Sequence, residues 1–236
     1  MSAAQAVRIR KVVSTVSQIQ IPIFPIKSVL FPGTLVRLKV VDPRYRALLD
    51  TAVALHDRRF GVALTREETG GEGDAALHSI GTLAQILHLT REKGHAVNII
   101  AVGRERFRIV SLDRAGVFPT ASVEDAPIRA VASPEVLALE HKVRAIATEY
   151  FAVLLNLGED DSDRLKLPAA AVPLAHFIAA NVQIPLDLRQ HLLEFNELEG
   201  LLGEEIGLLE RELTRLQWFE SQRRLRPKGP TPYSLN

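Results

Sequence analysis

The segment IPIFPIKSVLFPGTLVRLKVVDPRYRALL at 21–49 limits the possible folds more than any other part of the chain. Its first alternating stretch contains two prolines, which cannot donate to a ladder, so we expect a strand that lies at a sheet edge or starts late. A Phe-Pro-Gly turn at 31–33 leads to a second alternating stretch at 35–40, typical of a half-buried strand. Asp42 and Pro43 then suit the N-cap and the first position of a helix. The segment therefore predicts strand, turn, strand and helix in that order.

A hairpin is predicted in the next part of the chain. Two long strand-like stretches, 78–90 and 96–110, are separated by a short polar turn. Gly81 and Gly103 within them indicate bulges or bends. The remaining strands are expected at two shorter stretches, 59–65 and 117–124.

The composition changes near residue 126, after which helical spacing replaces alternation. Ser133 is a good N-cap for the first helix, and a second helix is expected over 167–182, with a kink or a late start at Pro173. A short third helix and a long one at 195–224 follow. Segregated strands and helices predict an α+β fold, with a small β-rich subdomain (a twisted sheet or pseudo-barrel with one helix) before an all-α helical bundle that ends in a long helix.

We divide the chain into four parts on this basis. They are a flexible N-terminal arm at 1–18, the β-rich subdomain at 19–125, the helical bundle at 126–225 and an extended C-terminal tail at 226–236. The acidic, glycine-rich stretch at 66–76 is interpreted as a solvated loop within the second part.

Composition limits the classes of partner. A net charge of +1 provides no global attraction for nucleic acid or for an anionic membrane. The chain has no cysteine, which excludes disulfides, thiol nucleophiles and thiolate zinc sites. No apolar run approaches the roughly 18 residues that a membrane-spanning helix needs, and we find no secretory signal pattern. We therefore predict a cytoplasmic protein that binds neither nucleic acid nor membrane.

Motifs that would supply catalysis are missing from the sequence. There is no G-x-x-x-x-G-K-[ST] loop for a triphosphate, no G-x-S-x-G nucleophile elbow and no H-E-x-x-H metal motif. His78, His88 and His95 lie on or near the predicted hairpin, and we favour scattered histidines over a zinc site, which needs three or four ligands in one geometry. We expect no enzyme activity, no catalytic residue, no cofactor and no metal site. A hydrolase with an unrecognised site is the alternative.

Two charged clusters are candidate contacts for a peptide or another partner. Arg104, Arg106 and Arg108 alternate along one predicted strand and could grip carboxylates or a peptide backbone. We favour the simpler interpretation, a solvated strand face with cross-strand ion pairs. Arg44 and Tyr45 in the first turn of the predicted helix have the same two interpretations, with Tyr45 half buried.

Aromatic residues provide two further candidate contacts. Phe31 and Pro32 form a turn whose Phe is either folded under as a plug, which we favour, or left exposed for a partner. Trp218 and Phe219 near the end of the long helix could anchor a contact. That helix carries an apolar seam, which either packs in its own bundle, as we favour, or dimerises as a coiled coil. The seam consists of Leu198, Leu202, Ile206, Leu209, Leu213 and Leu216.

Five short motifs occur in order along the chain. They are P-I-F-P-I…V-L-F-P-G at 22–33, D-P-R-Y-R at 42–46, F-G-V-A-L at 60–64, G-T-L-A-Q-I at 81–86 and V-G-R-E-R-F-R-I at 102–109. With the helical region after them, they resemble the amino-terminal domain of Lon-type proteases. The resemblance implies a region that helps to recognise unfolded substrates, contributes to hexamer assembly and has no peptidase activity of its own. No ATPase or protease motif follows, so we expect a stand-alone form.

The resemblance and the missing catalytic motifs together predict a non-catalytic module that binds unfolded or exposed apolar polypeptide. It would act as an adaptor or regulator of proteolysis, with a protease or chaperone system among its partners. Peptide would add as a strand to an open sheet edge. The alternative is an assembly protein that self-associates weakly through its long C-terminal helix.

Overall fold

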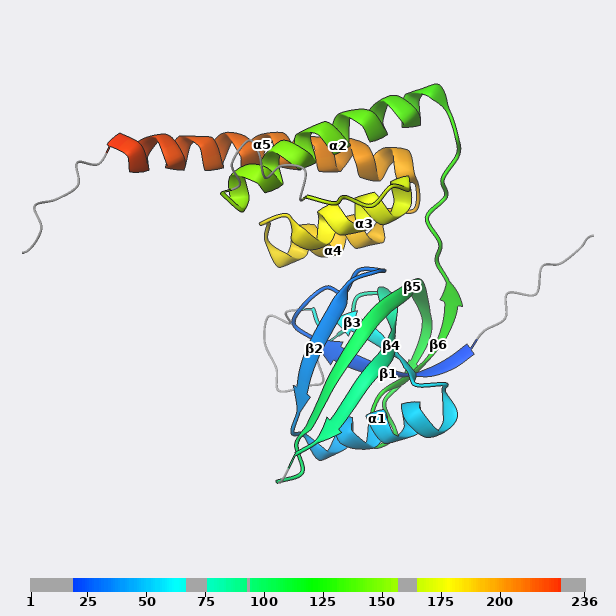
Figure 1. Cartoon of the computed structure of the whole chain (residues 1–236). Coiled ribbons are helices and arrows are strands. Elements are labelled where there is room, and N and C mark those ends of the chain that lie inside the picture. The colour runs from blue at the N-terminus through cyan, green and yellow to red at the C-terminus, as the bar shows by residue number, and fades with distance from the viewer. Residues whose placement is uncertain (1–18, 67–75, 93, 157–164, 226–236) are drawn as a thin grey trace, which may run out of the picture.

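The fold is seen in a computed structural model, which describes residues 19–66, 76–92, 94–156 and 165–225 (Figure 1). The predicted arm at 1–18, the predicted tail at 226–236 and most of the predicted loop at 66–76 lie outside the described residues. Within the described part, strands and helices are segregated along the chain, which confirms the predicted α+β class.

Six strands form one mixed sheet in the order β2-β5-β4-β3-β1-β6. They are β1 (Ile19–Ile26), β2 (Leu35–Val40), β3 (Arg59–Leu64), β4 (Ile80–Arg91), β5 (Val97–Asp113) and β6 (Thr120–Asp125). The long β5 also pairs with β6, so five of the strands close into a ring like that of a small barrel. β2 lies outside this ring and pairs only with β5. Among the described strands, β2 alone therefore has a single partner along its length.

The expectation that its prolines place the first strand at a sheet edge is wrong. β1 lies between β3 and β6 in the sheet. Its first half, 19–22, pairs only with β6, and its second half, 23–26, pairs only with β3. Each half of β1 therefore has one edge that pairs with no strand. Pro22 and Pro25 can lie there because an N–H group is not needed on an unpaired edge. β1 as a whole is an inner strand, but each of its prolines lies in a half that pairs on one edge only, so the rule that proline avoids central strands still holds for each half.

One helix covers the sheet on one side and four helices form a layer on the other (Figure 1). They are α1 (Pro43–Leu55), α2 (Pro134–Leu154), α3 (Ala171–Asn181), α4 (Leu186–Glu194) and α5 (Leu198–Leu225). The carboxylate of Asp42 accepts from the N–H of Arg44 at 2.8 Å, and the hydroxyl of Ser133 accepts from the N–H of Val136 at 3.2 Å. Both predicted caps are thus confirmed. Helix α3 starts late, which leaves Pro173 in its first turn, where its missing N–H is harmless.

The buried side chains form three clusters. One fills the helical layer and also takes in Phe31 from the β1–β2 turn and Ile80 from β4. A second lies between the sheet and α1, and a third lies at the β1–β6 side of the ring. The predicted leucine seam of α5 belongs to the helical cluster, with Leu202 and Leu209 fully buried. The seam therefore packs within its own bundle, as the favoured interpretation predicts.

Gly103 allows the β1–β2 turn to lie directly against β5. Its N–H donates to the carbonyl of Thr34 at 2.9 Å, and a Cβ added there would lie 2.3 Å from the carbonyl oxygen of Phe31. We expect Gly103→Ala to lower the free energy of unfolding by about 2 kcal/mol, because the backbone has to move. Urea denaturation measures the loss. Gly203→Ala is the matched control, because Gly203 lies in α5 with nothing near its added Cβ, and it should be neutral or stabilising. Equal stability of the two variants would contradict the packing argument.

Candidate functional site

The free edge of β2 is the first feature that could bind another chain. Residues of an antiparallel pair alternate between those that bond across the ladder and those that point their backbone groups away from it. Because the N–H of Gly103 bonds to the carbonyl of Thr34, this alternation directs the N–H and C=O groups of Leu35, Arg37 and Lys39 away from β5. An added strand would find these groups in the register that a sheet requires.

A groove of about 470 Å³ opens beside the start of this edge. The β1–β2 turn and β2 form one wall of it, and α3 and α4 form the other. Its wall residues include Val29, Leu30, Val36, Phe177, Ala180 and Arg189. We call this space the edge groove. Polar and apolar groups share these walls, and their apolar part, which includes Leu30, Val36 and Phe177, can accept an apolar side chain from a segment paired with β2.

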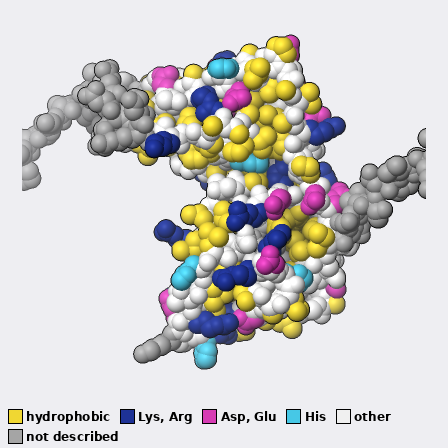
Figure 2. All heavy atoms as spheres, turned by 45° about the vertical axis from the view of Figure 1, so that its right-hand side comes forward, with side chains coloured by type: hydrophobic (Ala, Val, Ile, Leu, Met, Phe, Trp, Pro, Cys, Tyr) yellow, Lys and Arg dark blue, Asp and Glu magenta, His cyan; other side chains and the backbone are white. Residues whose placement is uncertain are grey.

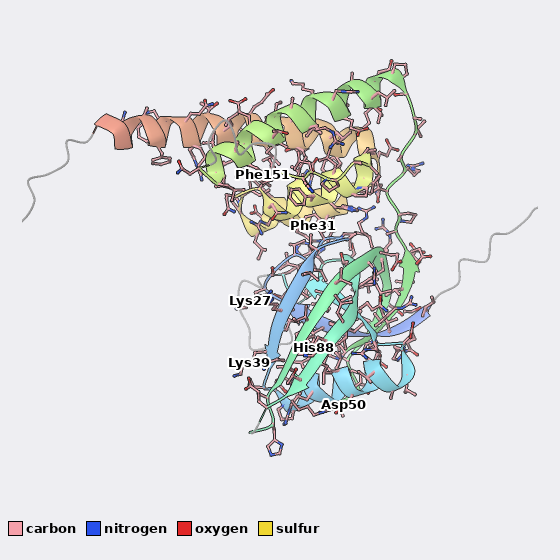
Figure 3. All side chains as sticks on the ribbon, in the orientation of Figure 1. Lys27, Phe31, Lys39, Asp50, His88 and Phe151 are labelled. Atoms are coloured by element: carbon pink, nitrogen blue, oxygen red, sulfur yellow. The ribbon has the colours of Figure 1, made fainter. Side chains whose placement is uncertain are left out.

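The side chains along the edge combine apolar surface and positive charge. Leu35 is 60% exposed at the start of β2. Arg37 and Lys39 are exposed on the same face of the strand, and Lys39 forms an ion pair with Glu92 at 2.9 Å. Figure 3 shows Lys27 and Lys39 on the β2 side of the sheet. Exposed cations on an edge strand also hinder uncontrolled pairing between copies, so contacts at such an edge are weak.

The prediction of a fully solvated arginine face is wrong at Arg106. Its side chain is only 3% exposed. Its Nε donates to the carbonyl of Ala126 at 3.0 Å, and its Nη1 donates to the carbonyls of Leu193 and Phe195. Burial, followed by repulsion from Arg108, lowers the pKa of Arg106 to about 10. The helical layer covers this part of β5, which alternation along a strand cannot reveal, and Arg106 ties the two layers together.

The neighbours of Arg106 on the same strand follow the favoured prediction more closely. Arg104 is exposed, and its Nε donates to Oε1 of Gln85 at 2.8 Å. Arg108 lies opposite Glu124 in the ladder and approaches it to 3.5 Å, which is a cross-strand ion pair. The three arginines therefore do not form one common contact surface.

Phe31 occupies the place predicted for a plug. It is 1% exposed and lies between the sheet and the helical layer, below Phe151 in the view of Figure 3 and in the same buried cluster. Its ring centroid lies 6.3 Å from that of His176, and its carbonyl accepts from the hydroxyl of Thr34 at 2.7 Å. Pro32 lines a separate pocket between the layers. Phe31 therefore supports the junction and is not presented to a partner.

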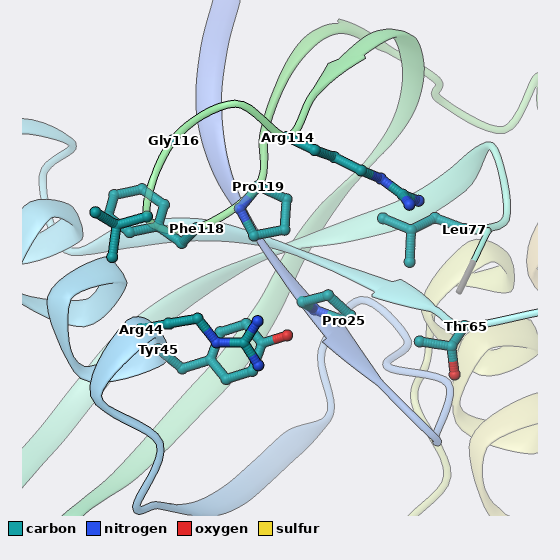
Figure 4. Close-up of a pocket in the computed structure, with 10 residues that line it drawn as sticks. Pro25, Arg44, Tyr45, Thr65, Leu77, Arg114, Gly116, Phe118 and Pro119 are labelled. Carbon is teal, nitrogen blue, oxygen red and sulfur yellow. The ribbon is translucent and has the colours of Figure 1, made fainter. Parts of the chain in front are cut away.

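Arg44 and Tyr45 line a pocket of about 350 Å³ at another end of the sheet (Figure 4). The guanidinium of Arg44 bonds to Asp42 at 2.9 Å and lies 5.6 Å from the centroid of the Tyr45 ring. Hydrogen bonds from the Arg44 side chain and backbone hold the pKa of Asp42 below its usual value. The Tyr45 ring packs on Phe24 at 4.7 Å between centroids, which agrees with the predicted half burial. Arg44 thus belongs to the cap of α1 and Tyr45 to the packing on Phe24, and a contact of either residue with a partner stays a prediction.

The remaining candidates lie apart from these places. Trp218 and Phe219 are 57% and 55% exposed on the distal part of α5, with ring centroids 5.0 Å apart. His78 contacts Glu194 at 3.0 Å, and His88 contacts Thr90 at 2.8 Å. In the described residues, no three His, Cys, Asp or Glu side chains are grouped so that they could hold a metal ion. Nor is any helix in that part of the chain long and apolar enough to cross a membrane.

No local sequence pattern predicts the polar residues that are buried at the junction between the sheet and the helical layer. Gln190 is 1% exposed, and its amide donates to the carbonyl of Ile80 at 3.1 Å and to Glu194 at 2.8 Å. His176 is buried beside Phe31. Figure 2 shows the junction as a narrowing of the molecule, with charged side chains of both signs over the sheet below it. Only the pairing of distant elements brings these residues together.

Comparison with known proteins agrees with this architecture. A family model described as the ATP-dependent protease La (LON) substrate-binding domain matches residues 20–211. A Lon protease of Roseiflexus castenholzii is 32% identical over 197 residues, which are 81% of this chain and 24% of that protein. A Lon protease of Anaeromyxobacter dehalogenans is 28% identical over 194 residues, which are 81% of this chain and 23% of that protein. The chain thus spans about a quarter of the length of these relatives.

Two solved structures share the fold. The N-terminal domain of a Mycobacterium avium complex Lon protease superposes with a TM-score of 0.64 at 22% identity, covering 81% of this chain and 98% of that one. A Lon N-terminal domain protein from Xanthomonas campestris superposes with a TM-score of 0.57 at 22% identity, covering 80% and 98%.

Proposed function

The chain belongs to the family of Lon substrate-binding domains, and from this premise we propose that it is a non-catalytic module that binds unfolded polypeptide along β2. The observation that carries the proposal is the free edge of β2 with the edge groove beside its start. The bound segment is extended and forms main-chain hydrogen bonds with the outward groups of Leu35, Arg37 and Lys39.

This mode of binding suits clients of many sequences. Main-chain hydrogen bonds do not depend on side-chain identity, and only a segment without its own tertiary structure can offer them along its length. The edge groove adds a preference for one apolar side chain, and Arg37 adds a preference for a neighbouring acidic one. Binding is weak, because an unfolded segment loses conformational entropy when it is ordered.

We further propose that the chain acts as an adaptor or regulator of proteolysis. The family description names a substrate-binding domain, and the relatives named above are Lon proteases. In this role, the module holds a client segment for a protease or chaperone system. The sheet region and the helical layer work as one unit, because Arg106 and Gln190 bond across their junction.

The test uses a proline at the outward edge. We expect Arg37→Pro to weaken binding of a permanently unfolded polypeptide, such as reduced and carboxymethylated α-lactalbumin, about tenfold, because the outward N–H is lost. Arg37→Ala, which removes the same side chain but keeps the N–H, is the matched control for the backbone contact. Fluorescence anisotropy measures the affinity, with native α-lactalbumin as the folded comparison.

Each outcome bears on the proposal. Selective binding of the unfolded polypeptide, lost in Arg37→Pro and largely kept in Arg37→Ala, agrees with strand addition. Equal affinities of the two variants, with both folded by circular dichroism, would rule out the β2 edge. Failure of the wild-type chain to bind the unfolded polypeptide at high micromolar concentration would contradict the proposed function itself.

A further inference from the structure

A second pocket, of about 440 Å³, lies between the sheet and the helical layer. It is separate from the edge groove and shares only Gly33 of the β1–β2 turn with it. Its apolar walls come from Pro32, Pro127, Ile128, Val172 and Pro173. We call this space the interlayer pocket. It has room for an aliphatic side chain with the backbone attached to it, and its apolar walls suit such a group.

Arg106 lines the interlayer pocket with a charge that lacks a counter-ion. Its Nε and Nη1 are occupied by three backbone carbonyls, while its buried Nη2 has no hydrogen-bond partner among the described residues. Within that same part of the chain, no acidic side chain forms an ion pair with it. The causes that lower its pKa are burial and repulsion from Arg108, with no attraction from an acid. A buried cation without an anion is costly, so an anion bound here would be stabilised strongly.

His176 adds a neutral polar group to the same pocket. Its side chain is 6% exposed, and its Nε2 has no partner among the described residues. Burial, with a smaller contribution from Arg106, lowers the pKa of His176 to about 4. The ring is therefore uncharged at neutral pH and can donate or accept one hydrogen bond according to its tautomer. The pocket thus offers one positive charge and one neutral hydrogen-bonding group.

The rim of the interlayer pocket limits the charge of the ligand. Glu105 and Asp125 line it from exposed positions, and Arg104 lies beside them. A ligand with several negative charges, such as a phosphate group, would be repelled by the two carboxylates. A single carboxylate that reaches Arg106 is compatible with them. These charges thus favour a monoanion joined to an apolar group over a ligand with several negative charges.

We propose that the interlayer pocket binds the C-terminal residue of a polypeptide, with its carboxylate at Arg106 and an aliphatic side chain against Val172 and Ile128. In a polypeptide, only the last residue carries a carboxylate and an apolar side chain on the same carbon atom. The identification of the ligand as polypeptide rests on the proposed function. The site itself rests on Arg106, His176 and the apolar walls.

The smallest probe is N-acetyl-leucine, compared with N-acetyl-leucinamide. We expect the acid to bind with a dissociation constant of about millimolar, as its size allows, and to shift the His176 ring signals in NMR spectra. The amide should bind at least about tenfold more weakly, because it cannot form a charged pair with Arg106. Equal binding of acid and amide, or no shift at His176, would overturn the proposal.

Longer probes separate a chain end from a free acid. A ten-residue peptide that ends in a free leucine should bind more tightly than N-acetyl-leucine, and its C-terminal amide should lose most of this affinity. Hexanoate tests a simple carboxylic acid. If hexanoate binds as well as the peptide, the ligand is a small acid and the assignment to a chain end is wrong.

A variant that leaves Arg106 in place tests the position of the site. Val172→Trp should place a bulky ring in the interlayer pocket and weaken binding of N-acetyl-leucine at least about tenfold, whereas Val131→Trp, at a position 72% exposed, should leave it unchanged. Unchanged binding in Val172→Trp would place the site elsewhere. Failure here is distinct from failure of the proposed function, because an unfolded polypeptide with an amidated C-terminus can still bind along β2.

Discussion

Replacement of Glu205 with methionine is expected to raise the free energy of unfolding by at least about 2 kcal/mol at neutral pH. Glu205 lies on α5 between the turns that contain Leu201 and Leu209, and it is 1% exposed. Both carboxylate oxygens lack a hydrogen-bond partner among the described residues. An unpartnered buried carboxyl group destabilises the folded state, and methionine has a similar length without the polar atoms.

The gain should depend on pH in a defined direction. Burial raises the pKa of Glu205 well above its ordinary value of 4.5. Below pH 4.5 the carboxyl group is protonated in both the folded and the unfolded chain, so its ionisation costs the fold nothing. As the pH rises from 4.5 towards the folded-state pKa, the unfolded chain releases the proton and the folded chain keeps it. The wild-type chain then loses stability by about 1.4 kcal/mol per pH unit relative to Glu205→Met.

Urea denaturation at several pH values between 4 and 8 measures this difference. Glu199→Met is the control, because Glu199 is exposed on the same helix, and its effect should stay within about 0.5 kcal/mol at each pH. The interpretation is wrong if the difference between wild type and Glu205→Met does not change with pH. In that case the carboxyl group is hydrated or paired when the chain is folded.

Local signals explain why much of the fold could be predicted. The side chains of Asp42 and Ser133 cap their helices within two or three residues, so the sequence around each is sufficient. The alternation in 35–40 reports the half-buried face of β2, and the spacing of the α5 seam reports the buried face of that helix. These patterns depend only on residues that are close together in the sequence, and the structure agrees with each of them.

The candidate site was harder to predict because it depends on which elements cover one another. Arg104 and Arg106 are two residues apart and look equivalent in the sequence. One is exposed, and the other is buried beneath the end of α4 and the residue that follows it, which are about ninety positions away in the chain. The free edge of β2 also depends on how distant elements meet, because the other five strands close into a ring and leave β2 outside it. Neither His176 nor Gln190 is marked by any local pattern.

Arg106→Met should be the most destabilising of the substitutions considered, with a loss of about 3 kcal/mol in the free energy of unfolding. Methionine can fill much of the volume of the arginine stem but donates no hydrogen bond. The carbonyls of Ala126, Leu193 and Phe195 then lose their donor at the junction between the layers. Removal of the uncompensated charge offsets part of this cost, which keeps the expected loss below the sum of three charged hydrogen bonds.

Arg104→Met is the matched control, because Arg104 lies on the same strand, is exposed and bonds only to Gln85 in the contacts described above. Its effect in urea denaturation should stay within about 0.5 kcal/mol. A second measurement does not depend on stability. The charge of Arg106 contributes to the low pKa of His176, so an NMR titration of folded Arg106→Met should show that pKa above about 4. If stability and the His176 titration both match wild type, Arg106 neither joins the layers nor supplies the charge of the interlayer pocket.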